Sequence, residues 1–271
     1  MSIADKTFFL GVGAQKSGTT WLSHYLASSG KVATFEQVKE YHVWDALHIP
    51  LCKARLVDRK DRHLRPDWNI RYHLQQSPEN YFDHFISLMD SQSKSMSFDI
   101  SPSYAGLSRD VFALIQRSFA QRNVLTKCIF LMRDPVDRCW SSARKGSLRR
   151  TGKRDVSEEE ILALAATAEA EMRTRYDLTM GELEAAFAPD RLYCGLYEEI
   201  FVLRDIARLS AFCNVEARPT LLEKPVFASE KGQPLSDEAR RTIAARYRHV
   251  YEFMAKRFPA TTELWSGYRY L

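Results

Sequence analysis

A glycine-rich loop between an apolar segment and a helical pattern is the feature that most limits how this 271-residue chain can fold. Residues Thr7–Val12 (TFFLGV) form a short apolar, aromatic-rich run, which predicts a buried strand. The loop 11–21 (GVGAQKSGTTW) follows, and apolar side chains then recur at helical spacing from Trp21 to Leu26. A strand, a loop and a helix in this order indicate an α/β fold, in which such a loop lies at the carboxyl edge of the sheet.

Strand and helix patterns continue to alternate after this unit. The further strands are expected at 32–35, 95–98, 124–132 and 191–197. The further helices are expected from Pro78 to Leu88 with Ser77 as N-cap, at 158–187 with Ser157 and Glu160 as a capping box, at 201–213, and from Ser236 to Arg257. We therefore predict an α/β fold with a central, mostly parallel sheet flanked by helices, built as a single domain over 1–271.

Charge and composition narrow the functional classes. The chain has 39 basic and 34 acidic residues, and this net charge of +5 favours an anionic ligand without indicating nucleic acid. No apolar run is long enough for a transmembrane helix and no signal peptide is recognisable, so a cytoplasmic protein without stable membrane insertion is expected. The five cysteines form no C-x-x-C pair, and neither a disulfide framework nor a metal site is expected.

The groups in the glycine-rich loop suit a phosphate. Glycines allow backbone N–H groups to approach an anion, and the N-terminus of the following helix adds partial positive charge. Lys16 supplies a cation, and the hydroxyls of Ser17, Thr19 and Thr20 supply hydrogen-bond donors. The alternative interpretation is an ordinary glycine-rich turn.

The loop departs from the nucleotide-binding pattern G-x-x-x-x-G-K-[ST]. Gly13 and Gly18 have the required spacing, but Thr19 stands where lysine belongs, and the lysine lies inside the loop at Lys16. This departure disfavours a standard ATP or GTP hydrolase. A phosphate-loop nucleotide kinase with Asp134 near a Walker-B position remains an alternative.

A second phosphate-binding segment follows the strand at 124–132. Arg133 stands at the strand end, Pro135 favours the start of a helix, and Ser141 lies eight residues after Arg133, about two helical turns on. A guanidinium group binds phosphate well. The alternative is a structural pair between Arg133 and a carboxylate.

These segments resemble the sulfotransferases that use 3′-phosphoadenosine 5′-phosphosulfate (PAPS). The resemblance is carried by KSGTTWL at 16–22, RDPVDRCWS at 133–141 and KEYHVW at 39–44, and it is nearest to the heparan-type branch, as a soluble bacterial member. It implies that Lys16, Ser17, Gly18, Thr19, Thr20 and Trp21 hold the 5′-phosphosulfate. It also implies that Arg133 and Ser141 bind the 3′-phosphate, and that Lys231 and Gly232 close over the cofactor.

The resemblance also assigns the acceptor side. Glu40 would be the catalytic base, with His42 as the alternative base or a supporting hydrogen-bond partner, and Lys39 would contact the acceptor. Ser101 and Tyr104, in DISPSY at 99–104, would line the acceptor site, although Ile100 replaces a lysine of the family.

The function implied is the transfer of a sulfuryl group from PAPS to a hydroxyl or amine by in-line displacement, with no metal. The acceptor would be a carbohydrate, a lipid or a small molecule, bound by insertions around 46–75 and 145–185. Neither nucleic acid nor a membrane span is expected. A catalytically inactive nucleotide-binding relative is the other alternative.

Overall fold

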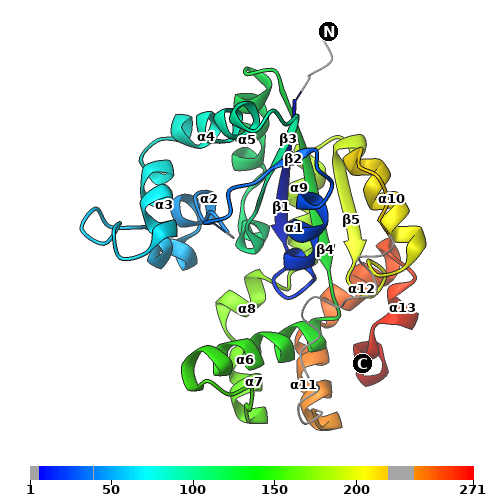
Figure 1. Cartoon of the computed structure of the whole chain (residues 1–271). Coiled ribbons are helices and arrows are strands. Elements are labelled where there is room, and N and C mark those ends of the chain that lie inside the picture. The colour runs from blue at the N-terminus through cyan, green and yellow to red at the C-terminus, as the bar shows by residue number, and fades with distance from the viewer. Residues whose placement is uncertain (1–5, 39, 219–234) are drawn as a thin grey trace.

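One parallel sheet organises the chain in the computed structural model, which describes residues 6–38, 40–218 and 235–271 (Figure 1). Its strands in these residues are β1 (Lys6–Gly13), β2 (Val32–Ala33), β3 (Met96–Ile100), β4 (Val124–Met132) and β5 (Leu192–Leu196). They lie in the order β2-β3-β1-β4-β5, and each pair of neighbours is parallel. The predicted α/β fold with a central parallel sheet is confirmed.

Helices pack on both sides of this sheet and connect its strands. The α-helices are α1 (Thr19–Ala27), α2 (Trp44–His48), α3 (Pro66–Gln76), α4 (Pro78–Ser91), α5 (Arg109–Ala120), α6 (Pro135–Thr151), α7 (Glu158–Ala165), α8 (Ala168–Met172), α9 (Tyr176–Ala186), α10 (Leu203–Cys213), α11 (Asp237–Arg246), α12 (Arg248–Arg257) and α13 (Thr261–Leu264). Short 3₁₀ helices are η1 (Pro50–Arg55), η2 (Pro102–Gly106), η3 (Pro189–Arg191) and η5 (Ser266–Tyr270).

The two faces of the sheet belong to two hydrophobic cores. Along β1, Phe8 and Leu10 lie in the larger core, which includes side chains of α4, α5, α9 and α12. Phe9, between them, lies in the smaller core with side chains of α1 and α10. All three side chains are fully buried because a parallel sheet covered on both faces has no solvent side.

The predicted helix at 158–187 is wrong, because the chain forms α7, α8 and α9 there. The capping box of Ser157 and Glu160 is present at the start of α7. A second cap interrupts the run, since the Thr167 hydroxyl accepts a hydrogen bond from the Ala170 N–H and begins α8. Gly181 does not interrupt the chain here but lies inside α9.

The predicted C-terminal helix is also divided, into α11 and α12, at Tyr247. Tyr247 is buried and its hydroxyl donates a hydrogen bond to the carbonyl of Ala165 in α7, 2.8 Å away. A long-range contact thus accompanies a break that the local pattern did not indicate. In the part of the chain that the structure describes, no helix has the length and apolar character needed to cross a lipid bilayer.

Candidate functional site

The loop between β1 and α1 has the backbone expected of an anion-binding turn. Lys16 and Gly18 have φ angles of 73° and 86°, and α1 begins at the next residue, Thr19. A Cβ atom on Gly18 would lie 2.6 Å from Cδ1 of Ile200. Glycine is therefore required at this position both by the positive φ angle and by the lack of space for a side chain. The Ser17 hydroxyl is buried and has no hydrogen-bond partner among the described residues. A hydroxyl in this position, beside the N-terminus of α1, fits a phosphate oxygen.

Arg133, at the end of β4, joins the second predicted segment to this loop. Its Nη1 donates a hydrogen bond to the carbonyl of Lys16 at 3.1 Å, and its guanidinium lies 4.4 Å from the ring centre of Tyr197. Its buried Nε has no hydrogen-bond partner among the described residues. Ser141 is half-buried in α6. Two segments that the sequence predicts to bind phosphate therefore follow β1 and β4. They are in direct contact through Lys16 and Arg133.

The Asp134 carboxylate fixes the turn that carries Arg133. One of its oxygens accepts hydrogen bonds from the N–H of Val136 at 3.0 Å and from the hydroxyl of Tyr251 at 2.5 Å. The other accepts from the Ser266 hydroxyl at 3.0 Å and the Gly267 N–H at 2.9 Å. The C-terminal turn η5 is thereby attached to the segment that the sequence predicts to bind a second phosphate.

Two further residues hold this turn. The Tyr176 hydroxyl donates a hydrogen bond to the carbonyl of Arg133 at 2.8 Å. Glu198 accepts from the Asp134 N–H at 3.2 Å and from the indole N–H of Trp265 at 3.0 Å. Burial raises the pKa of Glu198 to about 7. The sequence motif indicated Arg133 but none of these supports, which come from distant parts of the chain.

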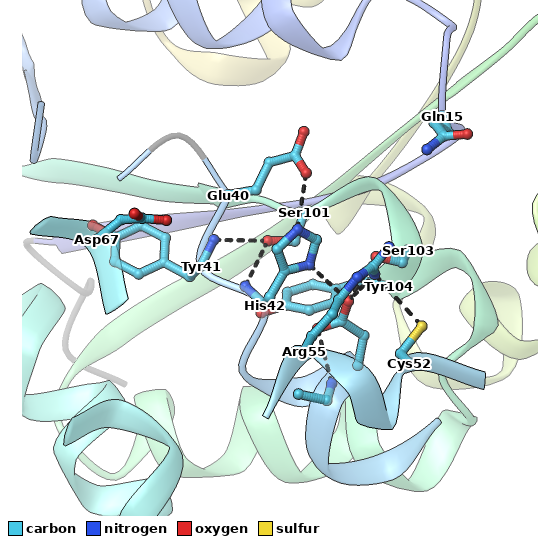
Figure 2. Close-up of polar contacts among 12 residues, drawn as sticks. Gln15, Glu40, Tyr41, His42, Cys52, Arg55, Asp67, Ser101, Ser103 and Tyr104 are labelled. Atoms are coloured by element: carbon cyan, nitrogen blue, oxygen red, sulfur yellow. Dashed lines mark hydrogen bonds and ion pairs between the residues drawn. The ribbon is translucent and has the colours of Figure 1, made fainter. Parts of the chain in front are cut away.

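On the other side of β1, Glu40 and His42 form a hydrogen-bonded line with residues that the sequence motifs did not indicate (Figure 2). Glu40 Oε2 lies 3.0 Å from His42 Nε2, and His42 Nδ1 lies 2.8 Å from Oδ2 of Asp45. The same Asp45 oxygen accepts hydrogen bonds from Arg55 at 2.5 Å and from Ser103 at 2.6 Å. Asp45 lies three residues after His42, a spacing that could have drawn attention to it.

The contact between His42 and Asp45 shifts the pKa values of both side chains toward their charged forms. Burial alone would lower the pKa of His42, but the hydrogen bonds of Asp45 and Glu40 outweigh it, so the pKa is raised above 6.5. Burial would raise the pKa of Asp45, but His42, Ser103 and Arg55 together lower it to about 2. Asp45 is therefore a fixed anion at neutral pH, and it favours the protonated imidazole of His42.

Ser101 and Tyr104 lie behind this segment. The Ser101 hydroxyl accepts hydrogen bonds from the N–H groups of Tyr41 and His42, at 3.1 and 3.3 Å, and donates to Asp99 at 2.7 Å. The Tyr104 hydroxyl accepts from the Val43 N–H at 3.2 Å and also donates to Asp99, at 2.7 Å. Both side chains are fully buried, so this arrangement differs from the acceptor-lining position that the sequence suggested. They hold the backbone around His42.

A chain of polar contacts connects the phosphate loop to the Glu40 side. Gln15 Oε1 accepts hydrogen bonds from Arg173 at 3.0 Å and from Ser142 at 3.2 Å. Arg173 pairs with Glu169 at 2.5 Å, and Glu169 lies 3.9 Å from Arg55. The predicted insertions 46–75 and 145–185 therefore meet at Arg55 and Glu169.

The remaining predicted residues have varied positions. Thr19 and Trp21 are buried residues of α1. The Trp21 ring stacks on Tyr25 with ring centroids 4.9 Å apart. Thr20 is half-buried. Lys39, Lys231 and Gly232 lie outside the described residues. Within the described ranges, no group of three or more His, Cys, Asp or Glu side chains could hold a metal ion.

Comparison with known proteins gives concordant results. Residues 6–254 match the sequence model of a family described as the sulfotransferase domain. The crystal structure of a sulfotransferase from Alicyclobacillus acidocaldarius has a TM-score of 0.58 and 17% identity, over 93% of this chain and 95% of that chain. The sulfotransferase domain from the curacin biosynthetic pathway has a TM-score of 0.48 and 16% identity, over 85% and 81%. No curated protein matches the sequence.

Proposed function

The chain belongs to the sulfotransferase domain family, and from this premise we propose that it transfers a sulfuryl group from PAPS to a hydroxyl or amine of an acceptor. The observation that carries the proposal is the contact between Arg133 and the carbonyl of Lys16, which joins two phosphate-binding segments into one site. A nucleotide with phosphates on both its 3′ and 5′ sides matches such a pair of segments. Within the family, the segment 39–44 supports a place near the heparan-type branch.

We assign the 5′-phosphosulfate of PAPS to Lys16, Ser17, Gly18, Thr19 and Thr20, and the 3′-phosphate to Arg133 and Ser141. The buried, unpartnered Ser17 hydroxyl and Arg133 Nε support this assignment, because buried polar groups are normally satisfied by a partner. Trp21, Lys231 and Gly232 complete the proposed nucleotide site. Lys16 and the loop N–H groups stabilise the charge that develops on the leaving phosphate oxygen.

On the acceptor side, Glu40 takes the proton of the attacking hydroxyl or amine. His42 holds the Glu40 carboxylate by its 3.0 Å contact, and Asp45 orients the ring of His42. His42 is the second candidate for the base, because Asp45 would stabilise the imidazolium that forms when His42 accepts a proton. Ser101 and Tyr104 support this segment through their hydrogen bonds to its backbone N–H groups. Lys39 would contribute to acceptor binding. The acceptor, a carbohydrate, lipid or small molecule, binds between the insertions 46–75 and 145–185.

The proposal is tested by incubating the purified protein with PAPS and a broad acceptor panel. Release of adenosine 3′,5′-bisphosphate and a sulfated product, detected by mass spectrometry, is the expected result. Lys16→Ala should abolish the reaction, because it removes the cation beside the leaving group, whereas Lys256→Ala, an exposed lysine of α12, should not. No product with any acceptor, or equal turnover in Lys16→Ala, would contradict the proposal.

Calorimetry separates the alternatives. Preferential binding of ATP–Mg over adenosine 3′,5′-bisphosphate would indicate a phosphate-loop kinase. Tight binding of the bisphosphate with no turnover of PAPS would indicate an inactive nucleotide-binding relative. The departure of the loop from the kinase pattern, with Thr19 in the lysine position, disfavours the first.

A further inference from the structure

The segment from Lys53 to Arg65 is rich in positively charged residues. It contains six basic residues and only two acidic ones, a net charge of +4, against +5 for the whole chain. Its residues 56–65 form the loop that leads into α3 and projects away from the sheet (Figure 1). We call residues 53–65 the basic loop. A concentration of like charge on one projecting loop creates a local field that the overall charge does not reveal.

Large apolar side chains are exposed among these charges. Leu64 is 69% exposed and Leu56 is 47% exposed, and Leu51, on η1 just before the loop, is 52% exposed. Arg59 and Lys60, between the two loop leucines, are exposed as well. Single exposed leucines are common in proteins, but here they alternate with cations in one short segment.

The loop has an ordered conformation that keeps these side chains outward. Gln75 of α3 accepts a hydrogen bond from the Val57 N–H at 2.9 Å, and the Leu64 N–H donates to the Asp61 carbonyl at 2.9 Å. Arg62 and Arg65 lie over the rings of Tyr72 and Trp68, at 5.5 and 5.6 Å. An arginine side chain therefore lies over one face of each ring, which reduces the aromatic surface open to the base stacking that single-stranded nucleic acid uses.

We propose that the basic loop binds the surface of an anionic lipid bilayer. Leu56 and Leu64 would enter the boundary between head groups and acyl chains, while Arg59 and Lys60 meet lipid phosphates. A protein partner fits less well, since the buried centres of protein interfaces are depleted of charged residues, whereas here charges separate the leucines.

The loop is directly connected to the proposed acceptor side. Arg55, within the loop, pairs with Asp45, which in turn holds His42. Binding through the loop would therefore bring the Glu40 side of the site near the lipid surface. The inference goes beyond the proposed function, because it concerns where the protein binds and not which group it transfers.

Co-sedimentation of the full chain with phosphatidylcholine vesicles, with and without phosphatidylserine, tests the proposal. We expect binding to the anionic vesicles only, weakened by salt. Arg59→Gln/Lys60→Gln should lower the partition coefficient about 25-fold, at about fivefold for each charge near the surface. Leu56→Ser/Leu64→Ser should lower it about tenfold, because two partly inserted apolar side chains are lost.

Matched variants provide the controls. Lys153→Gln/Arg154→Gln removes two exposed charges elsewhere, and Leu178→Ser/Leu203→Ser removes two leucines that are 56% and 58% exposed. Neither should change vesicle binding, and all four variants should bind adenosine 3′,5′-bisphosphate as the parent does. No binding to anionic vesicles, or equal loss in loop and control variants, overturns the proposal. If only the charge variants weaken binding and the leucine variants do not, the loop binds soluble polyanions and the membrane proposal fails.

Discussion

At the scale of single residues, the setting of Glu40 distinguishes it from an ordinary surface carboxylate. Its side chain is 29% exposed and in contact with His42, whose other ring nitrogen is held by the fully buried Asp45. The backbone carbonyl of Glu40 also accepts a hydrogen bond from Arg71 at 2.7 Å. A carboxylate held at both backbone and side chain, yet open on one side, is suited to a repeated proton transfer.

We expect Glu40→Gln to lower kcat for sulfuryl transfer by about 10²- to 10⁴-fold, because the amide cannot accept the acceptor proton. His42→Asn should have a smaller effect if His42 only orients Glu40. The measurement is steady-state turnover of PAPS with an acceptor found in the panel, together with the Kd for adenosine 3′,5′-bisphosphate, which should not change.

Glu36→Gln, at an exposed position four residues earlier, is the matched control and should leave kcat unaltered. A larger loss in His42→Asn than in Glu40→Gln would assign the base to His42. Sequence alone singled out both residues but could not order them, because the deciding partner, Asp45, became evident only from the folded contacts.

At the scale of elements, the loop between β1 and α1 has positive φ angles at Gly13 and Gly18, as its glycine-rich sequence favours. Gly18→Ala should destabilise the protein, because the new Cβ would combine a positive φ with close approach to Ile200. We expect a loss of about 2–4 kcal/mol in the free energy of unfolding, measured with urea.

Gly152 offers a matched control for this substitution. Its φ is 73°, but no atom lies within 4 Å of the position that a new methyl group would take, so Gly152→Ala should cost only about 1 kcal/mol. Equal losses in the two variants would show that backbone conformation, and not the contact with Ile200, makes Gly18 necessary.

Helices were predicted well where caps and periodicity agreed, and poorly elsewhere. The N-cap of α4 at Ser77 and the capping box of α7 are present as expected. Helix α5 was not predicted although Phe112, Ile115 and Phe119 are spaced as on one helical face, a signal that would have identified it. Thr167 caps α8 at the break between α7 and α8. The apolar pattern continues across this break, so the sequence did not indicate it.

At the scale of the whole molecule, the C-terminal turn η5 supports the proposed nucleotide site through Asp134. Gly267 packs against Tyr251, so Gly267→Ala would displace η5 from Asp134 and disturb the turn of Arg133. We expect binding of adenosine 3′,5′-bisphosphate to weaken about tenfold, and binding of adenosine 5′-phosphate to change less. Calorimetry with both ligands measures the difference.

Gly181→Ala, in α9 with open space around the new methyl group, should leave both affinities unchanged. Trp265→Phe, which removes the hydrogen bond to Glu198, gives a second variant if Gly267→Ala folds poorly. Equal weakening of both ligands would indicate general destabilisation and contradict a role in holding Arg133.

Buried acids give the whole protein a pH dependence. Burial raises the pKa of Glu198 to about 7 and that of Asp99 to about 6, from ordinary values of 4.5 and 3.8. The folded state therefore binds protons that the unfolded state has already lost. The stability from these groups is complete below about pH 4 and disappears as the pH rises through about 7.

Urea unfolding at about pH 5 and about pH 8 should give a smaller free energy of unfolding at the higher pH. Glu198→Gln should flatten this slope, because the titrating group is removed. Burial lowers the pKa of His84 to about 4, and this histidine contributes with the opposite sign up to about pH 6.5. The test is therefore the difference between the parent and Glu198→Gln, and an unchanged slope in the variant would contradict the role of Glu198. Asp45, whose pKa is lowered to about 2, has the opposite sign but acts only below about pH 4.

Local sequence was enough to predict the α/β class and to single out the loop 11–21 and the Arg133 segment, because each depends on residues close together in the chain. The groups that complete the site emerged only from the folded contacts. Asp134 meets Gly267 across 133 positions, and Gln15 meets Arg173 across 158. Folding also placed Ser101 and Tyr104 behind the His42 segment. The physical reason is that folding packs helices and turns from distant parts of the chain against the carboxyl ends of β1 and β4, and the sequence near each strand does not indicate which of them will be its neighbours.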